Sequence, residues 1–186
     1  MKYILLSIFV ALMLMANGQV TIYRTYEDFT SKKGEKYDDY KGFMHVLGKV
    51  KLSFIKDKEV TKIACKDMWG FEYKNILFRI DHEHQQTACC INTGKICYYE
   101  NGLAHLEMLR DNTDKAEFSV GYFSYISSDL NSELVPLPII GSLGTKKAYL
   151  VFKGKNPKHK VFYDCIEKNF DYNKVRQCVT DYLKTK

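Results

Sequence analysis

The sequence predicts an α+β protein: a mainly antiparallel, twisted β-sheet of about seven or eight strands, a short N-terminal helix, and a C-terminal two-helix hairpin packed on the sheet. Three observations support this fold class. Lysines alternate with apolar residues from Lys49 to Phe54, as in a strand with one buried face. The segment from Trp69 to Ile80 has the pairing pattern of a β-hairpin. After Asn156, apolar residues recur at helical spacing.

The hairpin holds the only tryptophan of the chain, and a two-residue turn at Lys74-Asn75 sets its register. This turn places six apolar or aromatic residues on one face: Trp69, Phe71, Tyr73, Ile76, Phe78 and Ile80. Three of them belong to the predicted core, which consists of Val50, Leu52, Phe54, Trp69, Phe71, Phe78 and Val120.

The other face of the hairpin places Arg79 across from Gly70 and diagonal to Glu72. Two interpretations stay open. The guanidinium group, exposed over the bare glycine backbone, would bind an anion. Alternatively, Arg79 and Glu72 form a surface ion pair worth under about 1 kcal/mol.

Residues 1–18 have the features of a signal peptide: a positive start, an apolar run from Tyr3 to Met15, and small residues before Gln19. The run is too short to span a bilayer comfortably, so no transmembrane anchor is expected after cleavage. Residues 19–186 then form a single mature domain on size grounds, with Thr25 as the cap of the short helix. The predicted location is the periplasm or cell envelope, with secretion as the alternative.

The net charge is +6, or +5 once Lys2 leaves with the signal peptide, and the lysines are spread along the chain. This mild excess is typical of a solvated surface. It is compatible with contact to anionic lipid or polysaccharide, whereas nucleic acid is not an expected partner of an exported protein.

Further elements follow from turn and cap signals. Asn101-Gly102 predicts a second hairpin with Tyr98 opposite His105. Phe118–Ile126 and Ala148–Phe152 are interpreted as strands. Asn156-Pro157 begins one C-terminal helix and Asp171 caps the next; their apolar stripes are Val161, Phe162, Cys165 and Ile166, then Tyr172, Val175, Cys178, Val179 and Tyr182.

Six cysteines in an exported chain raise the question of disulfides. Cys165 and Cys178 lie on the inward stripes of adjacent helices. A bridge between them is therefore predicted, with two buried thiols as the alternative.

His82 and His84 stand two residues apart, so both imidazoles would point the same way on a strand, and Cys89 and Cys90 follow closely. Zinc or copper accepts such ligands, although the spacing matches no standard zinc pattern. The alternative is a polar loop followed by buried or bridged cysteines.

No cofactor or catalytic motif is predicted. No serine stands in a Gly-x-Ser-x-Gly elbow, and the carboxylates are too scattered to nominate an acid pair. The predicted function is a non-enzymatic envelope module that binds a protein or ligand through an aromatic-rich surface, with Arg79, Glu72, Tyr98 and His105 as candidate binding residues. A metal- or thiol-linked role of the segment His82–Cys90 is the alternative, and an enzyme of unknown type is the third hypothesis.

Four features together resemble small exported proteins of the Bacteroidota: the leader before Gln19, the Trp69-Gly70-Phe71…Phe78-Arg79 hairpin, the segment from Ser127 to Leu137, and the C-terminal helix pair. The resemblance covers most of the chain after the leader. It implies export, and no activity or cofactor can be carried over from it.

Overall fold

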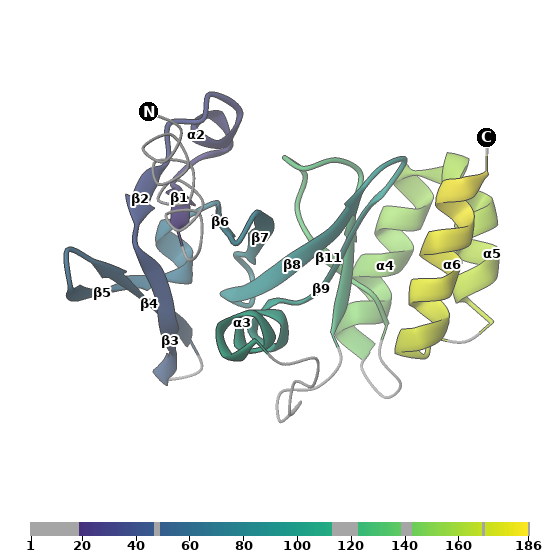
Figure 1. Ribbon diagram of the computed structural model, residues 1–186. Coiled ribbons are helices and arrows are strands. Elements are labelled where there is room, and N and C mark those ends of the chain that lie inside the picture. The colour runs from purple at the N-terminus through teal and green to yellow at the C-terminus, as the bar shows by residue number, and fades with distance from the viewer. Residues whose placement is uncertain (1–18, 47–48, 113–122, 139–142, 169, 186) are drawn as a thin grey trace, which may run out of the picture. The chain divides into compact units, whose positions relative to one another are not determined.

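The computed structural model describes residues 19–46, 49–112, 123–138, 143–168 and 170–185 (Figure 1). Within these ranges the fold is α+β, as predicted, with eleven strands and five α-helices. The chain divides into two compact units, one comprising Met1–Gln86 with Leu106–Asp114 and the other Thr87–His105 with Lys115–Lys186. The single mature domain stays a prediction, and the predicted leader and Val120 lie outside the described residues.

The first unit contains the predicted hairpin. Strands β2 (Glu35–Tyr37), β1 (Val20–Tyr23), β6 (Gly70–Tyr73) and β7 (Ile76–Asp81) pair in that order, all antiparallel. The register of β6 and β7 is the predicted one, with Phe71 opposite Phe78 and their rings stacked at 5.0 Å. Lys74 and Asn75 have φ values of 49° and 63°, which a primed two-residue turn requires.

A second antiparallel sheet in this unit consists of β3 (Asp39–Val46), β4 (Lys49–Lys56) and β5 (Glu59–Ala64). Val50, Leu52 and Phe54 are buried, so the predicted alternation in β4 is confirmed. The Phe54 ring lies 5.7 Å from the Phe71 ring, and the core of the unit therefore joins β4 to β6.

Helix α2 (Tyr26–Thr30) and the 3-10 turn η1 (Cys65–Asp67) also belong to the first unit, together with the part of helix α3 (Gly102–Asp111) that follows His105. Thr25 and Asp28 form a capping box at the start of α2. Phe29 packs on Trp69 with ring centroids 5.0 Å apart. This contact secures the short helix against the hairpin.

In the second unit, β8 (Gln86–Thr93), β9 (Cys97–Asn101), β10 (Ser124–Ser127) and β11 (Val135–Pro136) follow one another in the sheet. Helices α4 (Leu143–Lys155), α5 (Lys160–Ile166) and α6 (Tyr172–Lys184), with the 3-10 turn η2 (Pro157–His159), gather beside these strands (Figure 1). One core joins strands and helices: Ile96, Tyr98, Ile126, Leu137, Tyr149, Phe152, Phe162, Tyr163, Ile166, Val175, Cys178, Val179 and Tyr182.

The C-terminal helix pair and its disulfide are confirmed. Asp171 caps α6 by accepting hydrogen bonds from the next turn, and Cys165 and Cys178 are bridged with their Cα atoms 5.8 Å apart. One stripe residue was misplaced, because Val161 is 64% exposed. Pro157 is the first residue of the 3-10 turn η2, so the regular helix begins only at Lys160. The buried residues of this helix are Phe162, Tyr163 and Ile166.

The predicted strand Ala148–Phe152 is wrong, because this segment lies within α4. Tyr149 and Phe152, three residues apart, are both buried, as helical spacing allows. The predicted strand Phe118–Ile126 is described only from Phe123, and β10 covers Ser124–Ser127. In the described part of the chain, no helix combines the length and apolar character needed to cross a bilayer.

Candidate functional site

Glu100 in β9 is a fully buried carboxylate that three elements of the second unit hold in place. Arg176 of α6 donates from Nε to Oε1 at 2.8 Å and from Nη2 to Oε2 at 2.6 Å. The Nε2 atom of His105, in α3 (Gly102–Asp111), lies 2.9 Å from Oε2 of the same carboxylate. A buried charge needs such partners, and this one binds its cation in bidentate geometry.

The electrostatics of this network favour an ionised Glu100. Burial is the largest single influence and would raise the pKa, but hydrogen bonds with His105, Arg176 and Tyr172 outweigh it and lower the pKa of Glu100 to about 2. A carboxylate with that pKa is a poor general acid or base near neutral pH. The network therefore ties β9 to α6 and to the start of α3.

The predicted hairpin that pairs Tyr98 with His105 is wrong. Tyr98 lies opposite Asn92 and Ile126 in the sheet, whereas His105 belongs to α3. Tyr98 is fully buried, and burial, with the nearby charge of Glu100, raises its pKa. Both predicted residues do lie near one carboxylate, but Tyr98 offers no exposed group to a ligand.

The Asn101-Gly102 signal marks a helix start instead of a turn. The side-chain oxygen of Asn101 accepts hydrogen bonds from the backbone N–H groups of Leu103 and Ala104, as an N-cap does. A Cβ atom at Gly102 would lie 2.5 Å from the carbonyl carbon of Thr87. The glycine thus permits a close backbone approach between the helix start and β8.

Arg79 is opposite Gly70 as predicted, but the expected exposure is absent: its exposed fraction is 3%. Its guanidinium carbon lies 4.3 Å from the centroid of the Trp69 ring, a cation–π contact. Glu72 accepts a hydrogen bond from Tyr23 at 2.6 Å and lies 3.7 Å from Lys32. The expected exposure of Arg79 is therefore wrong, and its role as an anion-binding residue stays a prediction.

His82 and His84 are exposed in the turn that follows β7, in the first unit. The Nδ1 atom of His84 lies 2.8 Å from Asp81, whose other carboxylate oxygen accepts two backbone N–H bonds of the turn. Among the described residues, no group of three or more His, Cys, Asp or Glu side chains is arranged to hold a metal ion.

Cys89 and Cys90 are in β8 of the second unit, buried and half-buried respectively. Burial raises the pKa of the Cys89 thiol, which disfavours the thiolate that a metal or a redox reaction needs. A metal- or thiol-linked role of these residues stays a prediction, and the geometry adds no support to it.

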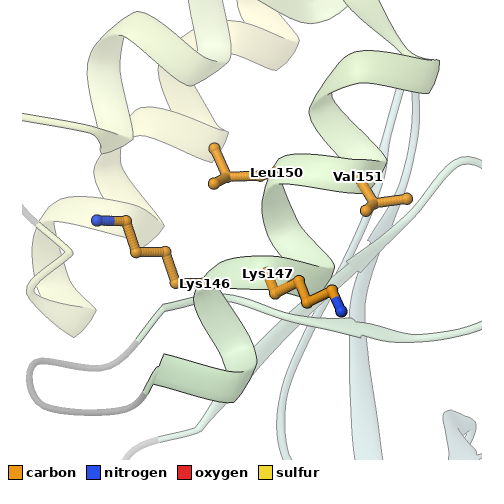
Figure 2. A pocket seen from close by; sticks show the side chains of 4 residues that line it. All are labelled: Lys146, Lys147, Leu150 and Val151. Carbon is orange, nitrogen blue, oxygen red and sulfur yellow. The ribbon is translucent and has the colours of Figure 1, made fainter.

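Helix α4 presents a feature of a different kind. Leu150 and Val151 are each 51% exposed, whereas Tyr149 and Phe152 of the same helix are buried. Lys146 and Lys147 precede the two aliphatic residues by one turn, so Lys146 is the neighbour of Leu150 along the helix and Lys147 is the neighbour of Val151. Figure 2 shows Lys146 and Leu150 projecting to one side of the helix axis, and Lys147 and Val151 to the other.

These four residues, here called the α4 face, line an open hollow of about 420 Å³. At Gly154, one turn further on, a Cβ would meet no atom within 4 Å apart from its chain neighbours and the backbone of its own helix, so this position also faces open space. The sequence contained a signal for this face: Lys146 and Leu150 are four residues apart, and so are Lys147 and Val151, as neighbours along a helix are. This helical spacing was missed because Ala148–Phe152 is interpreted from the sequence as a strand.

Searches against protein-family models, curated proteins and solved structures found no match to this chain.

Proposed function

We propose that this protein is a non-enzymatic binding module of the cell envelope and that the α4 face is its contact surface. The exposure of Leu150 and Val151 side by side on one helix carries the proposal. Apolar surface that stays in water costs free energy, and contiguous apolar surface rimmed by polar residues marks interaction sites, so these two adjacent residues are the place where we expect a contact.

The α4 face replaces the aromatic-rich surface expected from composition. Among the described residues, the exposed large apolar side chains are Met44, Val60, Ile91, Leu150, Val151 and Val161, and none of these is aromatic. The tyrosine and phenylalanine side chains are mostly part of the two cores. Of the six exposed residues, only Leu150 and Val151 are neighbours in the chain.

The contact should be weak and reversible. Fully burying a Leu or Val side chain contributes about 1.5–3 kcal/mol, and half of that area is already covered in each residue of the pair. Covering both therefore contributes about 2 kcal/mol. A contribution of this size alone gives only very weak binding, so a second favourable interaction is needed, which the adjacent lysines can supply.

The test is sedimentation of the exported chain, which starts at Gln19 if the leader is cleaved as predicted, with isolated cell envelopes. Leu150→Asn/Val151→Asn should lower the bound fraction by about tenfold or more, because the apolar term is lost. Val60→Asn, at an exposed aliphatic residue of β5, is the matched control and should bind as the parent does. Equal binding of the parent and the α4 variant would contradict the proposal.

A further inference from the structure

We infer that the occupant of the α4 face is a membrane surface that contains anionic phospholipid. This inference rests on the proposed function and names the partner of the same face. It follows from the distribution of charge around α4, the pairing of the individual lysines, and the combination of cationic and aliphatic side chains on the face.

The positive charge of the chain is concentrated in the segment that contains α4. Seven lysines and two carboxylates, Asp164 and Glu167, occur between Leu143 and Lys168, which gives a net charge of +5. The whole chain carries +6, so all other residues together contribute only +1. The lysines are spread along the sequence, but the carboxylates that balance them elsewhere are sparse here.

The two lysines of the α4 face are available to an anionic partner. Both are exposed, and in the described ranges neither has a carboxylate within 4 Å of its ammonium nitrogen. Other lysines of the segment are paired: Lys153 lies 2.6 Å from Glu167, and Lys160 pairs with Asp164. An anion at the α4 face thus displaces no existing ion pair.

The aliphatic residues distinguish a bilayer from a polysaccharide. A polysaccharide supplies negative charge but no apolar phase, so Leu150 and Val151 would gain nothing from it. The boundary between headgroups and acyl chains supplies both. There the aliphatic side chains reach the apolar layer, while the long stems of Lys146 and Lys147 bring their charges to the phosphates.

The expected affinity depends on lipid charge and on salt. A lysine close to an anionic leaflet strengthens binding by about fivefold, so neutralising two should weaken it by about thirtyfold. The effect falls off within a Debye length and is therefore screened at high ionic strength.

The experiment measures sedimentation of the exported chain with protein-free phosphatidylcholine vesicles, with and without phosphatidylglycerol. Binding should require phosphatidylglycerol, decline at high salt, and fall about thirtyfold in Lys146→Gln/Lys147→Gln. Lys49→Gln/Lys51→Gln removes two exposed lysines of β4 and should bind as the parent does. Near-UV circular dichroism verifies that each variant is folded.

The outcomes separate the inference from the proposed function. If the parent does not bind anionic vesicles, but its binding to cell envelopes still depends on Leu150 and Val151, the lipid inference fails and the binding face stands, with an acidic protein as its partner. If the two lysine variants lose vesicle binding equally, overall charge explains it and the inference fails. If the asparagine variants at positions 150 and 151 bind envelopes as the parent does, both fail.

Discussion

Removing the guanidinium group of Arg176 should cost the fold about 3 kcal/mol at pH 7. Arg176→Met eliminates hydrogen bonds of 2.8 and 2.6 Å and leaves the carboxylate of Glu100, which is 0% exposed, without its cation. Deleting one partner of a buried ion pair costs about 3–5 kcal/mol. The lower end applies because His105 and Tyr172 still hold the carboxylate.

The reciprocal change should cost less. Glu100→Gln is neutral and similar in shape, and the Arg176 side chain, 50% exposed, can be hydrated, so about 1–2 kcal/mol is expected. Arg176→Met should also raise the pKa of Glu100, so its penalty should shrink as the pH falls and the carboxylate becomes protonated. Urea unfolding followed by circular dichroism measures both variants and their combination.

Lys160→Met is the control for this pair. Lys160 and Asp164 are both largely exposed, and a surface pair contributes about 0–1 kcal/mol. A penalty for Arg176→Met no larger than that of Lys160→Met, or a penalty that does not change with pH, would refute the reasoning.

Burial lowers the pKa of His159 below its ordinary 6.5, so the unfolded chain binds the proton first and the free energy of unfolding should fall as the pH drops below about 6.5; His159→Asn should remove this part of the pH dependence. The disulfide joins residues 13 apart, and Cys165→Ser/Cys178→Ser should lower the free energy of unfolding by about 3 kcal/mol. Asn75→Val should cost about 1–3 kcal/mol, because φ at this position is 63° and a β-branched residue is strained there.

Urea unfolding as a function of pH measures these three effects. His82→Asn makes the same substitution at an exposed histidine and is the control for the substitution itself. Asn75→Gly should keep the stability within about 0.5 kcal/mol, since glycine accepts positive φ. The first prediction is contradicted if the free energy of unfolding of His159→Asn depends on pH as it does in the parent. The second is contradicted if the variant without the disulfide is as stable as the parent, and the third if valine and glycine at position 75 have equal effects.

Local patterns predicted the parts of the fold that local interactions determine. The alternation at Val50, Leu52 and Phe54 and the pairing of Phe71 with Phe78 need only the two-residue period of a strand. The disulfide followed from two neighbouring helices. Each of these features involves residues close together in sequence.

The failures involve interactions that the sequence pattern does not display. Asn101-Gly102 serves equally well as a turn or as a helix start, and the close approach of Thr87 decides between them. Glu100 meets Arg176 across 76 positions of the chain. The apolar run of α4 fits a strand or a helix, and only the packing of its neighbours separates its buried from its exposed residues.

The depth of position 150 in an anionic vesicle is the most direct measurement of the binding claim. Leu150→Trp places a reporter on the α4 face, and Val60→Trp places one on exposed β5 as the control; Trp69 is 7% exposed and contributes the same background to both. With anionic vesicles brominated in the acyl chains, we expect the emission of Leu150→Trp to be quenched and that of Val60→Trp to be unchanged. Equal quenching of both variants, or none at position 150 while the protein is bound, would contradict the account.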